Sequence, residues 1–275
     1  MQFTKKDIQL IDDMVKHHVS VSHNPAIANG SNIISYTLTP SKKQRMVLPI
    51  ASGGSSNFSG VEIELETEVE EKLCIQNIKS FTSILSSHMD CYGADNVYVE
   101  LDENDNVYIV SKEGDEVLST IMIRATDEMM TVPPSVANKN SDAYHRYMGY
   151  KYDGFEEKLK TLDKFETNIN TEILSTAIST YSSLGLKDVQ IKFIFKNGKV
   201  WVECGSDMNT SKHMMDDNVD FEGEFVAILS PKKLKSLKSG LLYKTRIFHK
   251  DGRIIIIAVS SVGQPIFYLT PERET

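Results

Sequence analysis

A short lysine-rich segment carries the clearest chemical signal in the chain. Between Ser230 and Ser239 four basic residues occur and no acidic one. They are Lys232, Lys233, Lys235 and Lys238. Ammonium groups bind phosphate oxygens without regard to base sequence. The segment therefore predicts either a solvated helix face, which is the commoner meaning of a charge run, or a surface that contacts phosphates.

The overall charge limits that second interpretation. The chain has 30 basic and 38 acidic residues and a formal net charge of −8. A protein that coats nucleic acid over its whole surface is normally basic. We therefore expect one short basic face on an otherwise acidic body.

A calcium loop is the next candidate. Asp102, Asn104, Asn106 and Glu113 occupy positions 1, 3, 5 and 12 of an EF-hand pattern. The sixth position is Val107, where a calcium loop needs glycine, and the flanking residues alternate as in strands. We therefore expect a hairpin turn built from Asn and Asp, without a metal.

The remaining motifs do not favour an enzyme. His17, His18 and His23 have no partners at metal-ligand spacing. The glycine-rich stretch Ser52–Gly60 lacks the Gly-Lys-Ser/Thr ending of a phosphate-binding loop. No nucleophile with its base is recognisable. We expect no catalysis, cofactor or metal. A magnesium-dependent enzyme stays open as an alternative, because scattered acidic residues could converge on one magnesium ion in the folded chain. They are Asp188, Asp207, Asp216 and Asp217.

Composition and termini indicate a cytoplasmic protein. The 275 residues are 40% apolar and 25% charged, and no apolar run approaches the roughly 20 residues of a membrane span. Lys5, Lys6 and Asp7 stand where a signal peptide has its apolar core. The isolated Cys74, Cys91 and Cys204 fit a reducing compartment, which for a viral protein would be the host cytoplasm or a viral replication compartment.

The first half of the chain alternates helices with strands. Apolar residues recur at helical spacing over Thr4–His18, with Thr4 as a cap, and again over Asn77–Met89. Strand-like runs cover 32–39, 44–50, 61–67, 96–101, 106–112 and 117–124. The segment 125–162 loses the pattern and is predicted to connect two domains.

The second half resumes that order. A helix is predicted to begin after its cap Asn170, and another at Ser230 with Pro231 in its first turn. Asn197-Gly198 is a strong hairpin signal, because both turn positions must tolerate a positive φ. Strands are predicted over 165–169, 189–196, 199–204, 219–229, 242–249, 253–260 and 265–270.

The shared order predicts an α+β protein built from two similar domains. We place them at 1–126 and 163–275, with the connector at 127–162. Each has two amphipathic helices packed on a mostly antiparallel sheet. The polar helix faces could line one common basic surface.

This layout resembles the DNA sliding clamps. Leu73–Leu85, the acidic hairpin and Thr131-Val132-Pro133-Pro134 look like the first domain of the T-even bacteriophage clamp. Phe165–Cys204 and Phe225–Leu234 are similar to its second domain. Ile266–Pro271 resembles the last strand of archaeal and eukaryotic trimeric clamps. The chain departs from the family in its longer connector and in Ser20–Glu70, which does not align.

The resemblance implies a homotrimeric ring with the processivity fold. It would encircle double-stranded DNA without sequence specificity, slide along it and tether the replicative DNA polymerase, with a clamp loader as a further partner. By position the channel would hold Lys5, Lys6, Lys16, Lys79, Lys232, Lys233, Lys235 and Lys238. A monomeric clamp-like processivity factor with an open basic face is the alternative.

The family also implies an apolar pocket for partner peptides between the domains, beneath the connector. By position its residues would be Val132, Pro133, Tyr243, Ile266 and Tyr268, although such residues are more often plain core. The trimer would close by pairing edge strands of neighbouring subunits. The candidate edges are Val107–Lys112 and Lys192–Lys196.

Overall fold

The chain forms two compact units, each described here by itself. The computed structural model describes residues 1–21, 34–49, 58–132, 137–151, 157, 159–182, 190–206, 209–229, 234, 237, 242–250, 253–260 and 266–269. Unit one comprises Met1–Met46 and Glu62–His145, and unit two comprises Val47–Val61 and Arg146–Thr275. Within the described residues, no helix combines the length and hydrophobicity that crossing a membrane requires.

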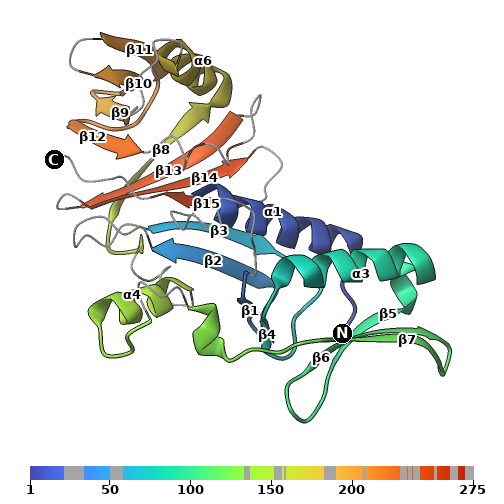
Figure 1. The fold of residues 1–275 in the computed structure, drawn as a ribbon. Coiled ribbons are helices and arrows are strands. Elements are labelled where there is room, and N and C mark those ends of the chain that lie inside the picture. The colour runs from blue at the N-terminus through green and yellow to red at the C-terminus, as the bar shows by residue number, and fades with distance from the viewer. Residues whose placement is uncertain are drawn as a thin grey trace. The chain divides into compact units, whose positions relative to one another are not determined.

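The elements up to the end of unit one follow the predicted order of helix, strands, helix and strands (Figure 1). They are α1 Lys5–Val21, β1 Tyr36–Leu38, β2 Lys43–Pro49, β3 Phe58–Glu64, β4 Leu73–Ile75, α3 Ile78–Tyr92, the 3₁₀ turn η1 Ala94–Asn96, β5 Val97–Leu101, β6 Val107–Glu113, β7 Glu116–Ile123 and η2 Glu128–Thr131. β1 pairs with β4, and β5, β6 and β7 form an antiparallel sheet in that order.

The start of α1 confirms its predicted cap. The Asp7 N–H donates to Thr4 Oγ1 at 3.1 Å, and the Thr4 N–H donates back to Asp7 Oδ2 at 2.9 Å. This reciprocal arrangement satisfies donors that the first helical turn leaves free. The predicted apolar positions Ile8, Ile11 and Val15 are all buried.

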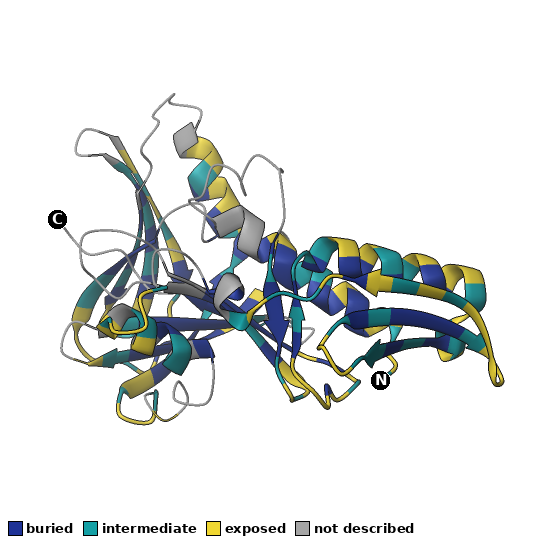
Figure 2. Cartoon of the chain, turned by 60° about the horizontal axis from the view of Figure 1, so that its bottom comes forward, coloured by how far each residue is buried: buried dark blue, intermediate teal, exposed yellow. Residues whose placement is uncertain are grey.

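The start of the second helix, α3, is also determined by residues next to it in the sequence. The Ser80 N–H donates to the Asn77 side chain at 3.3 Å, which caps the helix where the sequence predicts its start. Phe81 and Leu85 are fully buried, and the Phe3 ring meets the Phe81 ring edge-on with centroids 6.0 Å apart. Figure 2 shows the resulting alternation of buried and exposed positions along the helices.

The hairpin between β5 and β6 is a turn organised by one carboxylate. Asp102 Oδ1 accepts the N–H groups of Asn104 and Asn106 at 2.8 and 2.9 Å, and Asp105 adopts φ 60°. The Asn106 side-chain amide, ahead of the backbone donors, lowers the pKa of Asp102. The turn interpretation is therefore confirmed. Among the described residues no three metal-ligating side chains gather.

In the described part of unit two, the helix after Asn170 and most strands lie in the predicted places. Its elements are β8 Asp163–Asn170, α6 Thr171–Ser182, β9 Gln190–Lys196, β10 Lys199–Ser206, β11 Asn209–Asp216, β12 Glu224–Leu229, β13 Leu242–Lys250, β14 Arg253–Ser260 and β15 Ile266–Leu269. Asn170 caps α6 as expected, since its Oδ1 accepts the Glu172 N–H at 2.9 Å.

Two sheets make up this part of the chain. One has the order β11-β10-β9-β12, and the other has the order β2-β3-β15-β14-β13-β8. The predicted hairpin turn is confirmed, because Asn197 and Gly198 have φ values of 46° and 79°. Stacked rings pack the core of this unit, with the centroids of Phe165 and Phe221 4.6 Å apart and those of Phe195 and Phe225 also 4.6 Å apart.

Three expectations need correction. The connector is not irregular throughout, because α4 (Asp142–Lys151) begins where Ser141 Oγ accepts the Tyr144 N–H at 3.1 Å, and Tyr147 is buried. β11 was not predicted, since six of its eight residues are polar and its apolar residues, Met214 and Met215, are adjacent rather than alternating. The two candidate edge strands lie inside their sheets: β6 is flanked by β5 and β7, and β9 by β10 and β12.

The lysine-rich segment 230–239 lies largely outside the described residues. Only Leu234 and Leu237 are described there. Both are buried, and the Leu237 N–H donates to the Leu234 carbonyl at 3.1 Å.

Candidate nucleic-acid interface

Four of the eight predicted DNA-binding lysines are described, and all four lie on α1 and α3 of unit one. Lys5, Lys6 and Lys16 are on α1, with side chains 65, 66 and 69% exposed. Lys79 is half-buried in the first turn of α3. Outside the described residues lie Lys232, Lys233, Lys235 and Lys238.

The two helices pack against each other, which brings their polar faces together (Figure 1). The Thr82 hydroxyl of α3 donates to Asp12 Oδ1 of α1 at 2.7 Å. Thr82 is buried and Asp12 is half-buried, so this bond lies at the seam between the helices. It fixes how the exposed side chains of both helices are arranged within unit one.

The α1 lysines form ion pairs within unit one. Lys5 Nζ lies 2.7 Å from Asp90 Oδ1 on α3, and Lys6 Nζ lies 2.7 Å from Glu66 Oε1. The hydrogen bond with Glu66 raises the pKa of Lys6, and the same bond lowers the pKa of Glu66. Exposed pairs of this kind are weak and exchange readily for other partners.

The other two lysines differ from each other. Lys16 Nζ lies 3.3 Å from Asp13 Oδ1, one turn back along α1. Lys79 makes no ion pair with any residue that the structure describes. Lys5, Lys6 and Lys16 thus each have a counter-ion, whereas Lys79 has none among the described residues.

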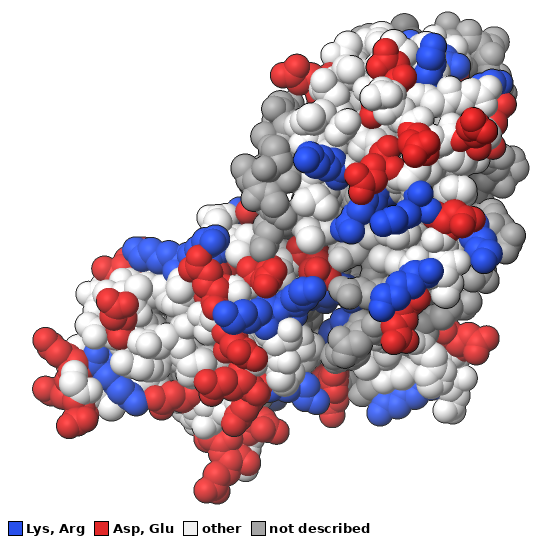
Figure 3. All heavy atoms as spheres, turned by 180° about the vertical axis from the view of Figure 1, so that it is seen from behind, with Lys and Arg blue, Asp and Glu red and all other residues white. Residues whose placement is uncertain are grey.

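The sequence analysis missed Asp90 and Glu66 as counter-ions, although acidic residues of α1 such as Asp13 were visible in it. Asp13 precedes Lys16 by three residues, a spacing that signals a helical pair. Asp90 and Glu66 are 85 and 60 residues from their lysines, so no local pattern points to them. On the face drawn in Figure 3, basic and acidic side chains are likewise interspersed, so it presents no single continuous basic patch.

The helix α6 holds no basic residue. Its exposed side chains are Glu172, Ser175, Thr176, Ser179 and Thr180. Hydroxyl groups can donate to phosphates but add no charge. In the described residues, the basic character expected for the helices is therefore confined to unit one.

Among the predicted pocket residues of unit two, Tyr243 does not share a surface with Ile266 and Tyr268. Tyr243 is 1% exposed and its ring packs edge-on against Phe267, with centroids 6.1 Å apart. In the register of β13, β14 and β15, Ile266 and Tyr268 alternate with Phe267 and so face the opposite side of the sheet. Tyr243 thus belongs to the core rather than to a surface shared with Ile266.

The other two predicted pocket residues belong to the segment before α4. Val132 is buried within unit one, and Pro133 lies outside the described residues.

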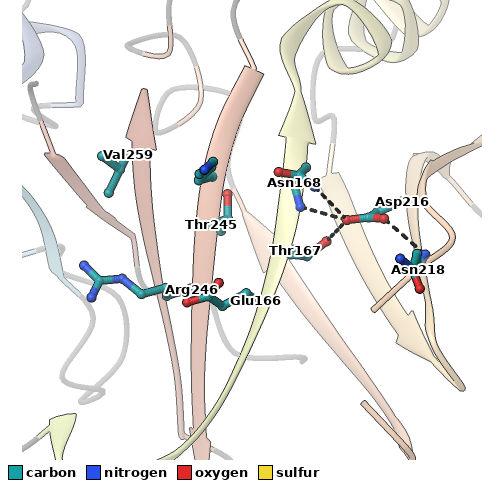
Figure 4. A pocket seen from close by; sticks show the side chains of 9 residues that line it. Glu166, Thr167, Asn168, Asp216, Asn218, Thr245, Arg246 and Val259 are labelled. Carbon is teal, nitrogen blue, oxygen red and sulfur yellow. Dashed lines mark hydrogen bonds between the residues drawn. The ribbon is translucent and has the colours of Figure 1, made fainter. Parts of the chain in front are cut away.

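Unit two holds a polar cavity of about 580 Å³ (Figure 4). Its lining residues come from β8, β13, β14 and the end of β11: Glu166, Thr167, Asn168, Asp216, Asn218, Lys244, Thr245, Arg246 and Val259. No motif in the sequence analysis pointed to this cavity, because its residues meet only through sheet pairing.

The Asp216 carboxylate, which lines one side of the cavity, is fully hydrogen-bonded. Asp216 Oδ2 accepts from the Thr167 hydroxyl at 2.9 Å and from the N–H and side-chain amide of Asn168 at 2.9 and 3.3 Å. Asp216 Oδ1 accepts the Asn218 N–H at 3.2 Å. Burial by itself raises the pKa of Asp216, but these hydrogen bonds together lower it. The carboxylate is therefore ionised and already satisfied.

Comparison with known proteins places the fold. No protein-family model matches the sequence, and no curated protein is significantly similar to it. Solved structures do match. The putative DNA polymerase III beta subunit of Eubacterium rectale superposes with a TM-score of 0.56 at 13% identity, covering 98% of this chain and 64% of that chain. The Thermotoga maritima beta subunit matches with 0.53 at 16% identity, covering 98% and 65%.

A third matching structure is described as a sliding clamp. The DNA polymerase sliding clamp of Caulobacter crescentus superposes with a TM-score of 0.51 at 13% identity, covering 99% of this chain and 64% of that chain. The chain thus spans about two thirds of the length of these bacterial proteins. The fold is that of the sliding clamps, and the predicted α+β class is confirmed. The T-even bacteriophage type stays a prediction.

Proposed function

We propose that this protein is a DNA sliding clamp, a non-catalytic ring that encircles duplex DNA and tethers a replicative polymerase. The observation that carries the proposal is the packing of α1 against α3 in a clamp fold, with exposed lysines on α1 and the half-buried Lys79 on α3. A clamp loader would be a further partner. The two clamp domains would be 1–126 and 163–275, joined by the connector 127–162.

The charge balance of these helices suits sliding. Lysines that contact phosphates bind any sequence, with an affinity that falls steeply as salt rises. Counter-ions such as Asp90 and Glu66 compete with phosphate for Lys5 and Lys6. Contacts to DNA would therefore be weak and short-lived, so that the ring is held by its topology rather than by affinity.

The remaining DNA contacts are proposed by position. They are Lys16, Lys79, Lys232, Lys233, Lys235 and Lys238. For the partner-peptide pocket, Ile266 and Tyr268 remain the candidates in unit two, and Val132 and Pro133 remain the candidates in the connector.

The ring would close through the exposed edges of two sheets. β7 is an edge strand whose apolar Val117, Leu118 and Met122 are 54, 41 and 58% exposed. β11 is an edge strand with Met214 42% exposed. Edge strands with unpaired backbone groups and exposed apolar side chains readily pair with another chain. We propose that β7 of one copy pairs with β11 of the next in a homotrimer.

The first experiment is the mass of the purified protein by light scattering over a concentration series. Three copies of the 30.9 kDa chain are expected. The second step is a salt challenge on DNA: a closed ring stays on nicked circular DNA in roughly 1 M salt and slides off once the DNA is linearised, because salt disrupts the phosphate contacts but leaves the topological link intact.

Two outcomes would count against the ring. A monomer at every concentration would exclude the closed ring for the isolated protein. Salt-labile binding that is equal on circular and linear DNA would support a monomeric processivity factor with an open face instead.

A further inference from the structure

The helix α3 covers one face of the three-stranded sheet β5-β6-β7. The His88 ring of α3 is hydrogen-bonded to the Ser111 hydroxyl of β6 at 2.8 Å. Val99 and Ile109 pair directly on that same face, and both are buried. The residues between them along each strand point to the opposite side of the sheet.

That opposite side carries exposed apolar side chains. Tyr108 of β6 pairs with Met122 of β7, and Met122 is 58% exposed. Tyr98 and Tyr108 are half-buried, and Val117 is 54% exposed. We call the surface formed by Tyr98, Tyr108, Val117 and Met122 the outer sheet face. Exposed apolar surface of this kind is typical of interaction sites.

The two hairpins that bound this face are strongly acidic. Residues 97–124 include seven acidic and two basic side chains, a net charge of −5 out of −8 for the whole chain. Figure 3 shows acidic side chains gathered over both hairpin turns, at its left and lower edges. Five carboxylates at the turns are exposed and form no ion pair with any residue that the structure describes. They are Glu103, Asp105, Glu113, Asp115 and Glu116.

The bases nearby do not cancel this charge. Lys112 is already paired with Glu100 at 2.5 Å, and its Nζ lies 5.4 Å from the centre of the Tyr98 ring. Lys72, outside the sheet, is paired with Glu128 at 3.0 Å. Arg124 is the second base of residues 97–124. The excess of carboxylates at the hairpins therefore favours a cationic partner.

The geometry of the sheet favours a helix lying on its face. Beside β5, the Met1 nitrogen donates to the Val99 carbonyl and the Val99 N–H donates to the Met1 carbonyl, both at 2.8 Å, so Met1 occupies that edge. The seven residues of β6 span about 23 Å between the two acidic turns. A helix of about 15 residues has the same length. A second copy of the same face would bring two net negative charges together.

We propose that the outer sheet face binds an amphipathic helix of a partner protein that carries basic residues near both ends. Its apolar stripe contacts Tyr98, Tyr108 and Met122, and its basic residues meet the carboxylates of the two hairpins. This site lies within unit one and requires neither DNA nor ring closure. Because Tyr98 and Tyr108 lie on β5 and β6, the face stays accessible when β7 pairs with another copy.

The test uses the full-length protein and a fluorescein-labelled helical peptide, followed by fluorescence anisotropy. The peptide has about 15 residues, with two lysines at each end and four leucines at i, i+3, i+4 and i+7 spacing. We expect saturable binding that weakens as salt is raised. A peptide with glutamates in place of the lysines should not bind, nor should a scrambled peptide without the leucine stripe.

Variants of the protein separate the charge from the apolar contact. Glu103→Gln and Asp115→Asn should each weaken binding about 1.5- to 5-fold, the range for one exposed ion pair. Tyr98→Ala should weaken it at least about 5-fold, as expected for an aromatic contact at the centre of an interface, whereas Tyr98→Phe should bind like the wild type. Asp217→Asn removes an exposed charge of unit two and is the matched control.

Four results would overturn the proposal. They are no binding at millimolar peptide, equal binding of the scrambled peptide, an equal loss in Asp217→Asn, and self-association of the wild type beyond a trimer that Tyr98→Ala abolishes, which would assign the face to a second copy. Light scattering and retention on circular DNA keep the clamp function separate, because Glu103→Gln and Tyr98→Ala should leave both unchanged.

Discussion

The Lys5 ammonium lies 2.7 Å from the Asp90 carboxylate, which connects the first turn of α1 to the last turn of α3. Both side chains are more than half exposed, at 65 and 63%. In the proposed clamp, this carboxylate would compete with DNA phosphates for Lys5.

Replacing Asp90 with asparagine should therefore strengthen DNA binding. An exposed ion pair is worth about 0.2–1 kcal/mol, so Asp90→Asn should raise the affinity for duplex DNA about 1.5- to 5-fold at low salt. Fluorescence anisotropy with a labelled duplex measures this. Asp115→Asn removes the same charge from an exposed hairpin position and serves as the control. An equal gain in both variants would mean that the change in net charge, rather than loss of the ion pair with Lys5, accounts for the stronger binding.

Lys79 should bind a phosphate without first breaking an ion pair. Lys79→Ala should lower the slope of log affinity against log salt by roughly 0.9 for each phosphate that the variant no longer neutralises. Lys139→Ala, an exposed lysine of unit one outside the helices, should leave the slope unchanged. Titrations at several salt concentrations decide the matter. A slope unchanged by Lys79→Ala would remove that residue from the interface.

The exposed edge strand β7 should control assembly. Leu118→Lys and Met122→Lys would place ammonium groups in the proposed strand pair, where burying an unpaired charge is unfavourable. We expect the trimer to dissociate at protein concentrations at least about 10-fold higher than for the wild type, as measured by light scattering. Leu242→Lys is the control, because Leu242 is similarly exposed but β13 is an interior strand. Dissociation in that variant alone would refute the assignment of the edge.

The Asp216 network should make stability depend on pH. The pKa of Asp216 is lowered from 3.8 in the folded state, so its contribution is present above pH 3.8 and is lost as pH falls through the lower folded value. Asp216→Asn should lower the free energy of unfolding by about 1.5–3 kcal/mol near neutral pH, the range for hydrogen bonds to a charged group.

Urea denaturation at pH 7 and near pH 2 tests this. The difference between Asp216→Asn and the wild type should shrink at the lower pH. The exposed neighbour variant Asp217→Asn should differ little at either pH. A difference that is independent of pH would mean that packing, rather than the ionised carboxylate, accounts for the loss.

The local features of the fold were predictable because they depend on neighbours in sequence. The caps at Thr4, Asn77 and Asn170 and the positive φ of Asn197 and Gly198 follow from side-chain chemistry within one turn. The failures arose where long-range pairing decides the outcome. For example, β6 pairs with β5 on one side, and it is an interior strand only because β7 pairs with its other side.

The sequence by itself determined which residues are lysines on amphipathic helices, and hence the kind of ligand that those helices suit. Tertiary structure alone decided what surrounds them. Asp90 reaches Lys5 across 85 residues because α1 packs on α3. Tyr243 and Tyr268 face opposite sides of one sheet because the register of three strands assigns them there. Helical periodicity is encoded within a few residues, whereas helix packing and strand register are set by the burial of the whole unit.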